Sequence, residues 1–272
     1  MSDAFEPRSA YRRRFRPFAS FLAALRFLTR LPVPFVRRMD PPALKDSMAM
    51  FPVVGALVGA ISAAALILAN LAGLPDLFSA LLALAIAAMA TGAFHEDGLA
   101  DVADGFYGGA TREDRLEIMK DSRIGTFGTL TLIITVLARA SLLTALLDLP
   151  PAAVLVLMAG AGAFSRALMV DLLWATRPAR ANGLSAMAGQ PTRNVTLAAL
   201  AIGGIGAGLG GSLVLSPEAG VLALVAGGLA LAIVRATAMR KIGGQTGDVC
   251  GAGQVLSETA MLAVYAATVS LL

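Results

Sequence analysis

The sequence predicts an all-α membrane protein: a polytopic helical bundle with about seven transmembrane helices, a cytoplasmic N-terminus and an N-terminal amphipathic segment. Two observations carry this prediction. Hydrophobic residues make up 57% of the 272 residues and charged residues only 15%, and the mean hydropathy is +0.75. Several runs of Ala, Leu, Val and Gly are apolar all round and reach the ~18–20 residues that cross a bilayer, whereas a soluble core requires amphipathic helices or alternating strands.

Residues 1–50 are expected to form a basic cytoplasmic segment. They contain ten Lys and Arg residues, and Arg26 and Arg30 interrupt the apolar stretch 18–31. Such a stretch makes a poor signal peptide and suits an amphipathic segment at the membrane surface. Residues 51–272 are expected to form a single transmembrane catalytic domain.

Seven apolar runs are the candidate spans, at residues 51–74, 76–95, 128–148, 152–174, 195–215, 219–238 and 255–272. With the N-terminus inside, the connections 96–127, 175–194 and 239–254 face the cytoplasm. The outer connections contain no Lys or Arg, whereas ten of these residues precede the first span and four lie in 96–127. This asymmetry follows the positive-inside rule. Membrane orientation thus explains the net charge of +4, and no nucleic-acid partner is expected.

Glycines inside the spans predict close helix packing. Gly55 and Gly59 are four residues apart, and the run 203–211 is glycine-rich; small residues let helix backbones approach one another in lipid. The single cysteine, Cys250, excludes an intramolecular disulfide. The sequence has no Cys/His cluster with the spacing of a zinc site.

An acidic stretch between Phe94 and Gly128 contains eight Asp and Glu residues. Asp97, Asp101 and Asp104 have i, i+4, i+7 spacing, so on a helix they fall within about 60° of one another. Carboxylates on one face suit Mg²⁺ or Mn²⁺ that holds phosphates; the alternative is a solvated acidic helix end. The glycines of residues 104–109 should end this helix, and a capping box at residues 111–114 should begin another.

Other candidate residues surround this stretch. Lys120 and Arg123 are cations that could hold phosphate oxygens. His95 directly precedes the aspartates and is either a helix-end residue or a catalytic one. Trp174 is expected to be an interfacial anchor.

A second polar island covers residues 241–253. Its turn includes Gly243, Gly244 and Thr246, and such turns can aim backbone N–H groups at phosphate. Asp248 follows as a candidate metal ligand or base. The alternative is a flexible loop.

Three charged residues fall in or near spans. Arg139 lies deep in its span, which favours a structural ion pair. Arg166 either pairs, with Asp171 as a candidate partner, or binds an anionic substrate. Glu258 lies at the mouth of the last span, where an ionisable group indicates function or pairing. Together with the aspartates, these residues indicate metal-assisted phosphoryl transfer at the cytoplasmic face.

The sequence also resembles a known family. The segments HEDGLADVADGFYGG and REDRLEIMKDSRIGTFG, with FLTRLPVP (27–34), FPVVGALVG (51–59), RPARANGL (177–184) and GGQTGDVCGA (243–252), are similar to the cobalamin synthase (adenosylcobinamide-GDP ribazoletransferase) family. The resemblance covers most of the chain in the right order.

The resemblance implies a multi-pass enzyme of the bacterial inner membrane whose active site faces the cytoplasm and requires Mg²⁺. It would join adenosylcobinamide-GDP to α-ribazole or α-ribazole 5′-phosphate and release GMP. Under this hypothesis the metal ligands are Asp97, Asp101, Asp104 and Asp248, and the proton acceptor is one of these aspartates, with His95 a further catalytic candidate. Phosphate would be held by Lys120, Arg123 and Arg166, and the turn Gly243–Thr246 would close over the nucleotide. A homo-oligomer is possible.

Two other functions stay open at this point. Cytidine-diphosphate-alcohol phosphotransferases also use spaced aspartates, but the DG-x-x-A-R part of their pattern fails here because Asp101 follows Ala100; aspartate-rich prenyltransferases match less well. A transporter is the alternative that is not an enzyme, motivated by Arg139, Arg166 and Glu258, although transport sites usually lie near the bilayer midplane.

Overall fold

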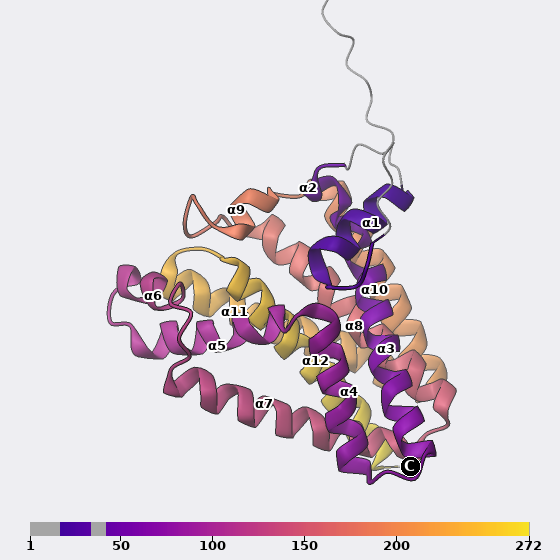
Figure 1. Ribbon diagram of the computed structural model, residues 1–272. Coiled ribbons are helices and arrows are strands. Elements are labelled where there is room, and N and C mark those ends of the chain that lie inside the picture. Colours follow the sequence, from indigo (N-terminus) through magenta and orange to yellow (C-terminus); the bar gives the residue numbers. More distant parts are fainter. Residues whose placement is uncertain (1–16, 34–41, 272) are drawn as a thin grey trace, which may run out of the picture.

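The computed structural model describes residues 17–33 and 42–271, and this part of the chain is built of helices joined by short connections (Figure 1). The helices are α1 (Pro17–Leu28), α2 (Leu44–Ser47), η1 (Met48–Met50), α3 (Phe51–Leu71), α4 (Asp76–Thr91), α5 (Phe94–Gly108), α6 (Arg112–Ile118), α7 (Thr126–Ala145), η2 (Leu146–Asp148), α8 (Pro151–Ala175), α9 (Leu184–Ala188), α10 (Arg193–Val214), α11 (Pro217–Ile242) and α12 (Gly247–Val269). The expected all-α class is confirmed. Much of the basic N-terminal segment and the end of the FLTRLPVP motif lie outside the described residues.

Five helical segments are long and apolar enough to cross a membrane: Leu44–Leu71, Thr126–Asp148, α8, α10 and α11. A sixth span results if α4 and α5 are counted as one broken span. The expected count of seven is therefore not confirmed. Helix α4 has only 16 residues, and α12 is long enough but carries Asp248, Gln254 and Glu258 along its length.

Helix α8 lies at the centre of the bundle and packs against α3, α10 and α12. The expected role of glycine is confirmed where α3 crosses α8. A Cβ on Gly55 would lie 2.1 Å from the Gly162 carbonyl oxygen, and one on Gly59 would lie 2.3 Å from the Met158 carbonyl oxygen. Both obstacles are backbone atoms, so only glycine permits this crossing.

A sharp bend separates α4 from α5. The axes of the two helices differ by 93°, and the linking residues Gly92 and Ala93 both have left-handed backbone angles, with φ of 70° and 54°. Arg30, just after α1, supports the bend: its N–H donates to the Ala90 carbonyl and its side chain packs over Gly92. Figure 1 shows α5 leaving the end of α4 sideways and running toward α6. The bend thus carries the acidic helix out of the line of α4.

The second polar island differs from the expected long loop. Helix α11 continues to Ile242 and α12 begins at Gly247, so only residues 243–246 connect them. Gly251 and Gly253 lie inside α12 and serve packing: a Cβ on Gly251 would lie 3.1 Å from His95 backbone atoms. The flexible-loop alternative is wrong for most of this island.

Candidate active site

Helix α5 presents the first two predicted aspartates on its surface. Asp97 is exposed and Asp101 is half-buried one turn later, as expected for i, i+4 positions on one face. The predicted boundaries hold, because α5 ends at Gly108 and a Thr111–Asp114 capping box opens α6. Two carboxylates therefore lie together on a rigid element.

Helix α12 brings Asp248 against α5. The two backbones approach so closely that a Cβ on Gly98 would lie 2.8 Å from the Asp248 carbonyl oxygen. Asp248 lies in the first turn of α12, whose N-cap is Thr246. Asp97, Asp101 and Asp248 are thus gathered where α5 crosses the start of α12, and we call these three residues the aspartate face.

Arg180 also reaches the aspartate face, and it was not among the predicted site residues. Its guanidinium lies 3.1 Å from Asp248 Oδ2, which also accepts a hydrogen bond from Thr246 Oγ1 at 3.1 Å. Its Nε is buried and has no hydrogen-bond partner among the described residues. The signal that could have identified it is its place in the segment RPARANGL.

The loop that carries Arg180 is fixed to the turn before α12. Pro178 and Gln245 form an isolated parallel bridge; the Ala179 N–H donates to Gln245 O at 2.7 Å and the Gln245 N–H donates to Arg177 O at 2.9 Å. Arg112 of α6 donates to the carbonyls of Ile242 and Ala179, at 2.9 and 2.5 Å. Three chain segments distant in sequence therefore hold the aspartate face in one unit.

The electrostatics of the aspartate face favour a cation. Burial, followed by the carboxylates of Asp97, Asp248 and Asp104, raises the pKa of Asp101 to about 7, with a smaller opposing effect of Arg180. Burial also raises the pKa of Asp248, against the effects of Arg180 and the Thr246 hydrogen bond. Mutual repulsion of this kind is relieved when a divalent cation or a cationic group joins the carboxylates.

Asp104, the third member of the predicted triplet, has another role in the structure. It is buried, and its two carboxylate oxygens accept hydrogen bonds from the N–H groups of Gly125 and Gly128, at 2.7 and 2.8 Å. These donors lie at the N-terminus of α7, so Asp104 satisfies backbone groups that a helix leaves unpaired there. The geometry favours a capping role over the expected metal and catalytic roles.

His95 lies away from the aspartate face. Its side chain is 1% exposed, its ring packs edge-on against Phe94, and its Nε2 has no partner in the described part of the chain. The helix-end alternative fits this burial better than a catalytic role does.

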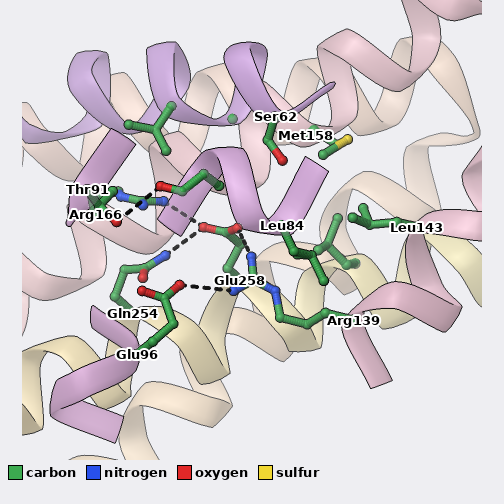
Figure 2. A pocket seen from close by; sticks show the side chains of 14 residues that line it. Ser62, Leu84, Thr91, Glu96, Arg139, Leu143, Met158, Arg166, Gln254 and Glu258 are labelled. Atoms are coloured by element: carbon green, nitrogen blue, oxygen red, sulfur yellow. Dashed lines mark hydrogen bonds and ion pairs between the residues drawn. The ribbon is translucent and has the colours of Figure 1, made fainter. Parts of the chain in front are cut away.

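The predicted intramembrane charges form a separate buried cluster (Figure 2). Glu258 of α12 pairs with Arg139 of α7 at 2.5 Å and with Arg166 of α8 at 2.6 Å. The structural ion pair expected for Arg139 is confirmed. Arg166 pairs with Glu258, whereas its suggested partner Asp171 faces Arg235 at 4.0 Å. The phosphate-binding role expected for Arg166 is not supported by this placement.

The remaining predicted residues are placed as follows. Lys120 is exposed, and Arg123, also exposed, pairs with Asp121 at 2.6 Å. Gly243 ends α11 with a left-handed φ of 71°, and Gly244 packs against the Arg177 carbonyl. The turn Gly243–Thr246 therefore positions Asp248 and the loop of Arg180.

The donor chemistry of the aspartate face fits Mg²⁺, because all its ligands are hard carboxylate oxygens. No group of three His, Cys, Asp or Glu side chains in residues 17–33 and 42–271 converges on one point as a metal site. Mg²⁺, however, is commonly held by one or two carboxylates together with substrate phosphates. The pair Asp97 and Asp101 meets that requirement.

The family model and the curated relatives assign the chain to the same family. Residues 20–266 match the CobS family, described as cobalamin-5-phosphate synthase. The chain is 46% identical over 254 residues to an adenosylcobinamide-GDP ribazoletransferase of Azorhizobium caulinodans, covering 91% of this chain and 95% of the relative. It is 40% identical over 251 residues to the protein of the same name from Brucella ovis, covering 89% and 94%. No solved structure matches.

Proposed function

Because the chain belongs to the CobS family of cobalamin-5-phosphate synthases and is an adenosylcobinamide-GDP ribazoletransferase, we propose that the aspartate face is its reaction centre. The enzyme is a multi-pass membrane protein and catalyses the final step of B12 nucleotide-loop assembly. The observation that carries the proposal is the close crossing of α5 and α12, which brings Asp97, Asp101 and Asp248 together beside Arg180. The family assignment sets aside the phosphotransferase and transporter alternatives.

The reaction transfers the cobinamide phosphate from GMP to ribazole. A ribazole hydroxyl attacks the phosphorus bonded to cobinamide, the P–O bond to the GMP phosphate breaks, and the hydroxyl proton passes to a base. The acceptor is α-ribazole or its 5′-phosphate. The family description, cobalamin-5-phosphate synthase, favours the phosphorylated acceptor, because its 5′-phosphate would remain in the product.

Asp97 and Asp101 are proposed to hold Mg²⁺ together with phosphate oxygens of the substrate. When bound, Mg²⁺ would neutralise charge on the diphosphate and on the departing GMP. Asp101 is only half-buried, and Asp97 is exposed, so both carboxylates are accessible to a substrate from the same side.

Asp248 is proposed as the base and Arg180 as the phosphate-binding cation. Burial raises the pKa of Asp248, which makes its carboxylate a better proton acceptor near neutral pH. The Arg180 side chain is 19% exposed beside it, and its guanidinium can bind two phosphate oxygens at once. Lys120 and Arg123, which are exposed, would make weaker contacts at the entrance.

The proposed orientation places the aspartate face on the cytoplasmic side of the bacterial inner membrane. Its support is the distribution of Lys and Arg, which avoid the predicted outer connections. Arg180, in one of the proposed cytoplasmic connections, lies against Asp248, and Arg112, in another, binds the carbonyls of Ile242 and Ala179. Seven spans result if both α4 and α12 cross the bilayer.

The test is GMP release by purified full-length protein as a function of Mg²⁺ concentration. We expect Asp97→Asn and Asp101→Asn to raise the Mg²⁺ concentration for half-maximal rate about tenfold or more. Asp248→Asn should lower kcat about 10²-fold or more without changing that concentration. The exposed Glu117→Gln is the control. Near-normal turnover in all three aspartate variants would contradict the proposal, as would protection from heat by a CDP-lipid but not by adenosylcobinamide-GDP.

A further inference from the structure

The buried cluster around Glu258 is built on the two carboxylate oxygens of that residue. Glu258 Oε2 accepts hydrogen bonds from Arg166 at 2.6 Å, from Gln254 at 2.6 Å and from Ser165 at 3.3 Å, and Gln254 also donates to Ser165 at 3.1 Å. The Arg139 and Arg166 side chains are only 10% and 5% exposed. These contacts join α7, α8 and α12 in the interior of the bundle (Figure 2).

The charges of Arg139, Arg166 and Glu258 do not balance. Two guanidiniums share one carboxylate, which leaves one positive charge in an interior where an unpaired charge is strongly unfavourable. Glu96 supplies the missing carboxylate, because its Oε1 lies 3.9 Å from Arg139. Its side chain is 27% exposed, and Figure 2 shows it beside Gln254, pointing toward Arg139. Four ionised groups then sum to zero.

Glu96 differs from the other three residues because it comes from α5. Its sequence neighbour is Asp97, and adjacent residues on a helix point about 100° apart. When Glu96 faces the buried cluster, Asp97 is turned outward to the surface where Asp101 and Asp248 lie. Any rotation of α5 that moves Asp97 therefore also moves Glu96 relative to Arg139.

The cluster also includes Gln254 and Glu258 of α12, the helix that carries Asp248. Glu258 and Asp248 are ten residues apart on α12, which is about 15 Å along a helix. The same cluster thus fixes both helices of the α5–α12 crossing at points away from the crossing itself.

We propose that Glu96 is a positioning residue for the phosphoryl transfer: it balances the Arg139–Glu258–Arg166 cluster and thereby sets the rotation of α5 and the placement of Asp97 and Asp101. This inference rests on the proposed function of the aspartate face. The competing explanation is that the glycine contacts at the crossing position α5 alone and that Glu96 contributes only to stability.

The experiment compares charge-breaking with charge-balanced variants of the full-length protein. Mn²⁺ binding is measured by electron paramagnetic resonance, and GMP release is measured against Mg²⁺ concentration. We expect Glu96→Gln and Arg139→Gln, alone, each to raise the Mn²⁺ dissociation constant about tenfold. The double variant Glu96→Gln/Arg139→Gln leaves the Arg166–Glu258 pair balanced, so its dissociation constant should return to within about threefold of the wild-type value.

The control is Glu113→Gln, which removes a carboxylate that is 76% exposed and pairs with Arg112 at the surface; no change is expected. Unchanged Mn²⁺ binding in both single variants, even with a lower melting temperature, would overturn the inference. So would a double variant that binds Mn²⁺ less tightly than either single variant.

Failure of a variant to fold, and normal Mn²⁺ binding by the aspartate variants, are two further outcomes. If Glu96→Gln does not fold, recovery of folding and Mn²⁺ binding in the double variant supports the inference, and failure of both overturns it. If Asp97→Asn and Asp101→Asn bind Mn²⁺ normally while the Glu96 and Arg139 variants do not, the metal assignment of the proposed function fails, and the role of Glu96 in placing these two aspartates fails with it.

Discussion

Asp248 lies directly against Gly98: a Cβ at position 98 would come 2.8 Å from the Asp248 carbonyl oxygen and 2.9 Å from its Cα. Both obstacles are backbone atoms, which cannot turn aside as a flexible side chain can. Since Gly98 is the residue after Asp97, this contact sets the separation between the aspartates of α5 and Asp248 of α12. The distance across the aspartate face therefore depends on residue 98 being glycine, which has no side chain.

Replacement of Gly98 by alanine should separate α5 from α12 and lower activity. A displacement of about 1 Å between reacting groups can cost about 10²-fold in rate, so kcat for GMP release should fall by about that factor in Gly98→Ala. The matched control is Gly108→Ala at the end of the same helix, where the nearest atom to a new Cβ is a side-chain carbon at 3.6 Å. Equal activities in the two variants would show that the crossing tolerates separation.

Asp104 should contribute to stability and not to metal binding. Its carboxylate caps the N-terminus of α7 through Gly125 and Gly128, and loss of a helix cap typically costs about 1 kcal/mol. Asp104→Ala should therefore lower the melting temperature, while its Mn²⁺ dissociation constant stays near the wild-type value. Asp97→Ala, at an exposed position, should show the reverse pattern. A shared loss of Mn²⁺ affinity would return Asp104 to the set of metal ligands.

Arg180 should determine the affinity for the diphosphate substrate. A hydrogen bond to a charged group contributes about 1.5–3 kcal/mol, so Arg180→Ala should raise the KM for adenosylcobinamide-GDP about tenfold or more. Arg180→Lys should recover only part of the lost affinity for adenosylcobinamide-GDP, because an ammonium cannot form the paired contacts of a guanidinium. Arg123→Ala is the control, since that side chain is 87% exposed. A KM that is the same in Arg180→Ala and Arg123→Ala would exclude the assignment.

Local patterns in the sequence predicted local features of the structure well. The spacing of Asp97 and Asp101, the capping box of α6 and the glycine contacts of α3 depend on residues close together in the chain or on composition, and all three were confirmed. The sequence also indicated that Arg139, deep in its span, needs an ion-pair partner, and that Glu258 has either a function or a partner. The structure pairs these two residues.

Features that depend on distant segments were missed. The capping of α7 by Asp104 follows from a fold in which residue 104 meets residues 125–128, and helical spacing alone placed Asp104 with Asp97 and Asp101. Arg180 becomes a site residue only through the bridge between Pro178 and Gln245. The bend at Gly92 and Ala93 ends α4 early, although the apolar run continues through it. In each case a tertiary contact overrode a sound local pattern.

Metal binding should depend on pH through Asp101. Burial and the neighbouring carboxylates raise its pKa to about 7, so below pH 7 the group is mostly protonated and a metal must displace the proton. The Mn²⁺ dissociation constant should therefore fall about tenfold per pH unit as the pH rises toward 7, and should level off above it. Asp101→Asn should bind Mn²⁺ more weakly and lose most of this dependence, whereas Glu117→Gln should keep it. A dissociation constant of the wild type that does not change between pH 6 and 8 would contradict the role of Asp101 as a metal ligand.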